Sequence, residues 1–367
     1  MSTRPALQFI TLAILLGLVA AASPSPSYET DRGRYEAIAR DVIVFDCDDI
    51  HCFRVLVPWV LGRLPGPSVL KWKIYAVMAN AGAAVALGQL CLVLGLSRRA
   101  ATLATWIAAF GWGSLFTLFD CYTSDPLMYL IGPLVTSALL QDRLRRALLV
   151  AGAGVMAKEF AAAPLWMFTM IAALQRRWAA AVRLLLGAMT VTLVWFALHT
   201  WLIAMYHYTL GRSAAIPLAP GGFLARWAGM LGPRLVILSL VAEFGALWLL
   251  FPVGLMRASR TLRLIALAAL PVAAVLINVQ QPDRALWNFH FIVIPASVLV
   301  LEAAPDWVCW SFVVTFGAAN LRLGAQLPYV PSGRILLAIS LVPASIALVA
   351  NARRGRTTLG SQALGKV

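Results

Sequence analysis

Charged residues are scarce in this chain of 367 residues: Asp, Glu, Lys and Arg make up 12% of it, against 61% hydrophobic residues. Soluble domains carry about 25% charged and about 45–50% apolar residues. The shortage of charge therefore excludes a soluble enzyme and a disordered tail. Five cysteines are too few for a disulfide-knotted secreted module. The sequence also lacks a zinc-ligand spacing, a glycine-rich phosphate loop and a nucleophile elbow.

Long apolar runs take the place of charge, and the mean hydropathy is +0.82. Because a bilayer-spanning helix needs about 20 apolar residues, the chain predicts an all-α integral membrane protein. We expect a single domain over 1–367, built as a polytopic bundle of about ten spans plus a broken, re-entrant helix pair. A first span or signal anchor covers 6–22, an outer loop 23–70, the remaining spans 72–350 and a cytoplasmic tail 351–367. The other spans fall near 72–96, 100–119, 126–140, 180–205, 235–255, 262–279, 287–301, 307–319 and 335–350.

The net charge of +15 is distributed as short basic clusters between the apolar runs. That pattern is typical of positive-inside topology and does not indicate a nucleic-acid partner. Arginine clusters flank 147–174 on both sides, so both of its ends are expected on the same side of the membrane. One simple span cannot satisfy this, whereas two half-helices meeting near Lys158 and Glu159 can.

The outer loop is rich in acids, and it is predicted to hold two short interfacial helices near 34–39 and 53–64. Further ionisable side chains recur at the outer ends of spans. Because such groups are costly at membrane depth, they usually mark a pathway or a site. The topology predicts that four segments meet in one polar pocket at the outer face; they contain Asp31, the 120–125 turn, Lys158 with Glu159, and Asp283 with Arg284.

Several short motifs, in order along 25–300, resemble those of the type-C glycosyltransferases of membranes. The segment 30–39, with Asp31 and Tyr35, is similar to the acidic first-loop motif, and 53–59, with Arg54, is similar to a segment of bacterial members. Asp125 before Pro126 resembles the second acidic motif. Lys158 with Glu159 resembles the Lys-Glu pair of the broken helix, and Asp283 with Arg284 resembles the late acidic-arginine element.

The resemblance implies a mannosyltransferase-like enzyme of the cell envelope, in a bacterial-type inner membrane with its active face outside. It implies transfer of a sugar from a polyprenyl-phosphate donor, within membrane lipid, to a glycan or lipid acceptor. Asp31 is the expected general base, and Asp125 orients the acceptor or acts as a second base. Arg284 and Lys158 are expected to hold the phosphate. The substrate-binding residues are completed by Glu159, Tyr35, Arg54 and Asp283.

Simpler interpretations stay open for these residues. Asp31 can pair with a neighbouring arginine of its loop, and Asp125 can cap a helix. Arg284 can act as an interfacial anchor. Lys158 and Glu159 can neutralise each other or Glu159 can hold a catalytic residue.

The segment 46–52 has no counterpart in the family pattern, and it leaves open which carboxylate of the first loop is the base. A divalent metal is conceivable through Asp46, Asp48, His51 and Cys52, but this mixture of hard and soft ligands suits no single metal, so no metal site is assigned. If this face is oxidising, a disulfide between Cys47 and Cys52 is the better interpretation, with Cys121 as an alternative partner.

Two other classes of function compete with the glycosyltransferase. A transporter or lipid flippase predicts inverted repeats and ionisable groups near the midplane, and Glu243, alone in mid-span, favours it. A non-catalytic membrane subunit of the same fold predicts that the motif acids are replaced. Asp31 and Asp125 are acidic, which argues against that third class.

Overall fold

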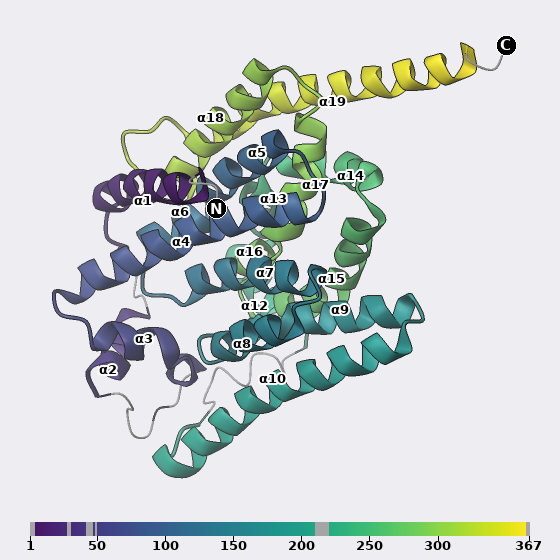
Figure 1. The fold of residues 1–367 in the computed structure, drawn as a ribbon. Helices are drawn as coiled ribbons and strands as arrows, with labels where there is room; N and C mark the ends of the chain where they lie inside the picture. Colours follow the sequence, from purple (N-terminus) through teal and green to yellow (C-terminus); the bar gives the residue numbers. More distant parts are fainter. Residues whose placement is uncertain (1–3, 28–30, 42–46, 48–49, 210–219, 365–367) are drawn as a thin grey trace.

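The computed structural model describes residues 4–27, 31–41, 47, 50–209 and 220–364, and over these residues it is helical throughout, with no strand (Figure 1). The all-α class predicted from the apolar runs is therefore confirmed. Among the described residues, six segments are long and apolar enough to cross a membrane, which supports an integral membrane protein. They comprise α1 (Arg4–Ala22), α4 (Ser68–Val93), α5 (Arg98–Ala109) continued by α6 (Trp112–Phe119), α10 (Trp178–Tyr206), α15 (Arg260–Val279) and most of α19 (Gly333–Leu364).

Four further apolar segments are shorter than a full span. They are α7 (Asp125–Leu140), η2 (Glu159–Ala162) with α9 (Ala163–Leu174), α14 (Leu247–Arg257) and α17 (His290–Leu301). The expected number of about ten spans is consequently not established by helix length, which supports six, or up to seven with one bent pair.

The spans divide into a buried centre and a periphery. In the apolar 18-residue stretch of each segment, 67% of the residues are buried inside the protein in α4 and 72% in α5–α6. The buried share is only 22% in α10 and 28% in α19. Figure 1 shows α10 along one edge of the bundle and α19 along the opposite one. Apolar side chains such as Leu186 and Leu193 are left exposed on α10, as expected for a face that meets lipid.

The break predicted near Lys158 and Glu159 is present. Helix α8 (Leu144–Val155) ends there, and η2 with α9 returns the chain. Leu144 at the start of α8 and Gln175 just after α9 line the same cavity, so both ends of this segment lie at one end of the bundle. This is the arrangement that the flanking arginine clusters predicted.

A second break was not predicted. The expected span 235–255 consists of α13 (Pro233–Phe244) and α14, separated by Gly245, whose φ of +49° is one that side-chain-bearing residues rarely adopt. Helix α12 (Gly222–Leu231) is bent by 111° against α13. The apolar pattern runs through Gly245 without interruption, which is why it suggested one straight span.

The remaining helices include the two predicted in the outer loop. Helix α2 (Arg32–Asp41) and helix α3 (Leu56–Gly62) occupy the expected segments, and they pack against each other. The other elements are η1 (Ile50–Phe53), α16 (Pro282–Trp287) and α18 (Asp306–Leu323).

Trp287 fixes the short helix α16 to the centre of the bundle. Its side chain is fully buried and stacks on Phe244 at a ring separation of 5.0 Å. The indole lies against Gly111 and Gly113, at the start of α6, where a Cβ atom would come within 2.1 Å of the ring. The two glycines thus make the space that seats α16.

Gly113→Ala is expected to destabilise the protein by about 1–3 kcal/mol, because the new methyl group overpacks a fixed ring. Gly152→Ala is the matched control, since a Cβ there meets nothing within 4 Å and alanine favours a helix by up to about 1 kcal/mol. Thermal unfolding in detergent measures both. Equal stability of the two variants would contradict the packing described for Trp287.

Candidate active site

The centre of the site is the carboxylate of Asp125, at the start of α7. Lys158 donates from Nζ to Oδ1, and both side chains are only 1% exposed. Arg284 approaches the other oxygen, with Nε at 2.8 Å and Nη2 at 2.6 Å from Oδ2. One buried carboxylate therefore joins two cations that lie far apart in the sequence.

Local structure places each of these three side chains. Pro126 stands in the first turn of α7, a position that suits its fixed φ and its missing N–H, and the backbone N–H of Asp125 donates to Thr123 Oγ1 at 3.2 Å. The same Thr123 hydroxyl accepts from Arg284 Nη2 at 2.9 Å. Lys158 is in extended conformation between α8 and η2, so the break in the helix points its side chain at α7.

Glu159, the neighbour of Lys158, has a different partner. Arg54 Nη2 lies 3.1 Å from Glu159 Oε1, and the arginine side chain is 14% exposed. Lys158 and Glu159 therefore do not form a mutual ion pair; each neutralises a charge on another segment. The backbone N–H of Leu56 also donates to the carbonyl of Met156 at 3.1 Å, which ties the first loop to the same break.

Asp31 lies at the rim of this cluster. Its Oδ2 is 3.1 Å from Nε2 of His51, and the two side chains are 32% and 20% exposed. The charges of Arg54 and Arg284 both act on the Asp31 carboxylate. Tyr35 is buried beneath, with its ring edge-on to His51 at 5.7 Å.

A disulfide joins Cys47 to Cys52 with a Cα–Cα distance of 6.4 Å, which confirms the pairing preferred from the sequence. Cys121, the alternative partner, is a buried free thiol. The disulfide closes a short loop around His51, and the carbonyl of Cys47 accepts from the N–H of Thr209 at 2.9 Å. His51 is consequently held close to Asp31 by covalent and backbone constraints.

The electrostatics of the rim follow from burial and from the neighbouring arginines. Burial alone raises the pKa of Asp31, but the hydrogen bond from His51 and the charges of His51, Arg284 and Arg54 outweigh it, so the pKa lies below its usual value. Burial lowers the pKa of His51, and the Asp31 contact only partly offsets this. At neutral pH the pair is therefore an ionised carboxylate beside a neutral imidazole.

An apolar groove of about 240 Å³ adjoins the site. It runs between α3 and α10 and begins next to Arg54. Its lining carries no exposed polar surface and consists of Val55, Leu56, Trp59, Met156, Leu198, Trp201 and Leu202. The exposed side chains of Trp59 and Trp201 place the groove at the lipid-facing surface.

Most of the expected site residues thus converge, with one partial exception. Asp31, Tyr35, Arg54, Asp125, Lys158, Glu159 and Arg284 form one connected group. Asp283 is close by, but its Oδ1 accepts from the backbone N–H of Arg284 at 2.8 Å and does not contact the cations.

Sequence reasoning overlooked two contributors. His51 was considered only as a metal ligand, and Thr123 was not singled out. The cysteines on either side of His51 were the available signal for its fixed position. Asp46, Asp48 and Asp49 lie outside the described residues, and within the described part no three His, Cys, Asp or Glu side chains gather as a metal site.

Comparison with known proteins finds no protein-family model and no curated sequence that matches this chain. The assignment of function below therefore depends on the geometry of the site and on the short motifs.

Asp125→Asn is expected to destabilise the protein by about 3–5 kcal/mol, because it leaves Lys158 buried without a counter-charge. Glu159→Gln is the control, since it removes the partner of Arg54 at a position that is 33% exposed, where water can replace part of the interaction. Denaturant unfolding in detergent compares the two variants. Retention of wild-type stability by Asp125→Asn would show that Asp125 does not neutralise the buried lysine.

Acidification is expected to weaken the wild-type fold through His51. Because its pKa is lowered from 6.5 in the folded protein, the unfolded chain binds more protons between that lowered value and 6.5, and stability falls as the pH drops through this window. Asp31 contributes to stability down to a lower pH than this window. Because its pKa is depressed below 3.8, that contribution is lost only as the pH falls through the depressed pKa. His51→Gln should flatten the decline in unfolding temperature between about pH 7 and pH 5. An unchanged decline would assign the effect to other histidines.

Proposed function

We propose that this chain is a membrane glycosyltransferase that moves a sugar from a polyprenyl-phosphate donor to a hydroxyl of a glycan or lipid acceptor. The observation that carries the proposal is the convergence of two cations on buried Asp125, with the ionised Asp31 at the rim above them. Cations beside a carboxylate base are what transfer from a phosphate leaving group requires. The resemblance to type-C glycosyltransferases at the same positions supports it further.

In this reaction the Asp31 carboxylate accepts the proton of the acceptor hydroxyl. The acceptor oxygen bonds to the anomeric carbon of the sugar while the bond from that carbon to the phosphate oxygen breaks. The polyprenyl phosphate leaves with the electron pair, and Arg284, whose side chain is 17% exposed, stabilises its negative charge. Lys158 is 1% exposed, so it acts indirectly, by holding Asp125 and through it Arg284 in place. His51 holds the base in position through its contact at 3.1 Å.

Asp125 takes a positioning role in the proposal. Both of its oxygens are occupied, one by Lys158 and one by Arg284, so it is poorly placed to remove a proton. It holds the two cations at a defined separation instead. The sequence analysis allowed Asp125 to orient the acceptor or to act as a second base. Because both of its oxygens are occupied, the proposal gives it neither role and has it orient the two cations instead.

The donor lipid is accommodated by the apolar groove between α3 and α10. Arg54 stands between this groove and the buried cluster, and Glu159 fixes its guanidinium. An isoprenoid chain in the groove would place its phosphate next to Arg54. The polar head then reacts at the interface while the tail stays in the bilayer.

The proposed topology adds α7, α13 with α14, α17 and α18 to the six long segments, which gives ten spans plus the broken pair α8–α9. The active face is outside and the arginine clusters are inside, in a bacterial-type inner membrane. The arginine clusters that flank α8 and α9 lie at the opposite end of these helices from Lys158, as this topology requires.

One observation favours a transporter or lipid flippase as a second candidate. Glu243 is fully buried in α13, and among the described residues neither carboxylate oxygen has a hydrogen-bond partner. Unpaired carboxyl groups in bent membrane helices mark ion pathways in transporters. However, α13 packs against α16, the helix that carries Arg284, so Glu243 adjoins the proposed active site.

Asp31→Asn is expected to lower sugar transfer by about 10²–10⁴-fold, because general-base catalysis contributes that much. Purified protein is assayed with radiolabelled polyprenyl-phosphate hexoses and with glycan and lipid acceptors. Glu36→Gln is the matched control: it removes an acid of the same loop that contacts Arg32 and Tyr122, and it should retain activity. Monodispersity in detergent checks the fold of each variant.

Two results would contradict the proposal at different levels. Transfer retained in Asp31→Asn would remove Asp31 as the base and direct the search to Asp46, Asp48 and Asp49. Absence of transfer by the wild type from every donor tested would overturn the glycosyltransferase in favour of the transporter or the non-catalytic subunit.

A further inference from the structure

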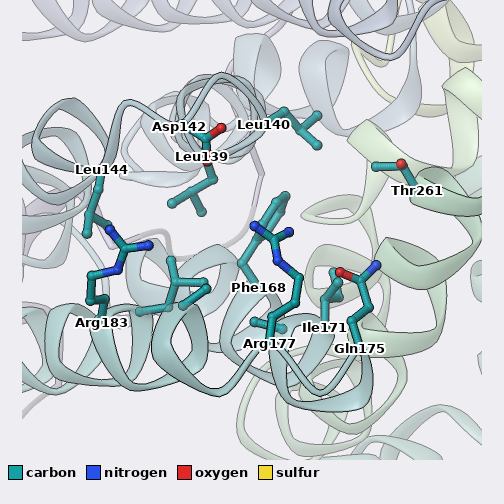
Figure 2. Close-up of a pocket in the computed structure, with 13 residues that line it drawn as sticks. Leu139, Leu140, Asp142, Leu144, Phe168, Ile171, Gln175, Arg177, Arg183 and Thr261 are labelled. Carbon is teal, nitrogen blue, oxygen red and sulfur yellow. The ribbon is translucent and has the colours of Figure 1, made fainter.

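A cavity of about 530 Å³ lies at the other end of α7 from Asp125. It is enclosed by the turn between α7 and α8, by α9, by the start of α10 and by Thr261 of α15 (Figure 2). The 16 residues of α7 separate it from the active site by about 24 Å, at 1.5 Å per residue. The cavity is therefore a separate site on the opposite side of the bundle.

Two arginines from α10 and its N-terminus face this cavity. Figure 2 shows the guanidinium groups of Arg177 and Arg183 directed into the space beneath the α7–α8 turn. In the part of the chain that the structure describes, neither forms a salt bridge with a carboxylate. Asp142 on the opposite wall is also without an ion pair there, so the charged lining has an excess of one positive charge.

The polar groups sit within an apolar frame. Phe168 and Ile171 of α9, Leu140 at the end of α7 and Leu144 at the start of α8 line the walls. Gln175 and Thr261 add hydrogen-bonding groups. Next to the cavity, Leu174 and Trp178 are 60% and 64% exposed. Exposed apolar side chains at the end of a span meet lipid, and tryptophan is favoured at the membrane interface.

The charge around the cavity has one predominant sign. Arg143, Arg145 and Arg146 follow Asp142 in the sequence, and Arg176 precedes Arg177. The positive charge of these arginines attracts the phosphodiester of a lipid headgroup but does not attract a small neutral molecule. The acyl chains of such a lipid would continue along the lipid-facing surface of α9 and α10. Basic pockets between spans on this side of a membrane suit anionic lipid headgroups.

We propose that this cavity binds the headgroup of an anionic phospholipid from the leaflet on the arginine-rich side. Arg177 and Arg183 hold the phosphate through charge-assisted hydrogen bonds, and Gln175 and Thr261 contact the polar part of the headgroup. This proposal is independent of the proposed glycosyltransferase activity, because it uses residues at the other end of the bundle.

Lipid binding is measured by native mass spectrometry of the full chain in detergent, titrated with phosphatidylglycerol or phosphatidylcholine. The wild type should bind phosphatidylglycerol at least tenfold more tightly than phosphatidylcholine, and Arg177→Gln with Arg183→Gln should abolish that preference. Arg145→Gln with Arg146→Gln is the matched control, since it removes two exposed arginines at the start of α8 that do not line the cavity. It should keep the preference.

A second variant tests the cavity itself. Ala180→Phe fills the space from α10 and leaves both arginines in place, so it should also abolish the preference. Equal loss in the control double variant would assign binding to diffuse surface charge and overturn the proposal. Three other results would also overturn the proposal. They are equal binding of the two lipids by the wild type, retention of the preference in Ala180→Phe, and complete displacement of the lipid by inorganic phosphate at millimolar concentration.

Discussion

The ion triad of Lys158, Asp125 and Arg284 is the interaction on which the end of the bundle with the candidate site depends. Each of these charges would be too costly to bury alone in an apolar bundle, and only the shared carboxylate makes the set tolerable. The triad also joins three elements that have no sequence proximity: the start of α7, the break before η2, and α16. Loss of the central carboxylate would leave two cations facing each other at membrane depth.

Several weaker interactions fix the positions of the segments that carry the triad and its rim. Trp287, packed against Gly111 and Gly113, seats α16 so that Arg284 reaches α7. Arg54 and Glu159 connect the first loop to the break in the helix, and the Cys47–Cys52 disulfide fixes the loop on which His51 contacts Asp31. Mobile loop residues alone could not keep a carboxylate at a fixed distance from two cations, so the rigidity of the rim is part of the proposed chemistry.

Much of this arrangement could be predicted from the sequence, because charges within apolar runs are rare enough to be conspicuous. The helical class, the break at Lys158 and Glu159, and the gathering of Asp125 with Arg284 followed from hydropathy and charge alone. The partners in each ion pair could not be predicted from the sequence. Lys158 and Glu159 are neighbours in sequence, yet each pairs with a residue on a different segment. The break at Gly245 was missed because it depends on one backbone angle that leaves the apolar pattern unchanged. The cavity near Arg177 is lined by parts of five helices, α7, α8, α9, α10 and α15, and no local pattern reports such a space.

The two ends of α7 show how burial decides the role of a charge. At one end Lys158 is 1% exposed and has its counter-charge built into the fold, because water cannot reach it. At the other end Arg177 and Arg183 remain hydrated, so the fold is stable without a carboxylate partner for either. A charge neutralised within the protein preserves geometry, and it suits a site where a reaction needs fixed cations. A charge left unpaired at the surface of the protein stays available to a ligand of opposite sign. The same side-chain chemistry can therefore build a preorganised site at one surface and a lipid-binding site at the other.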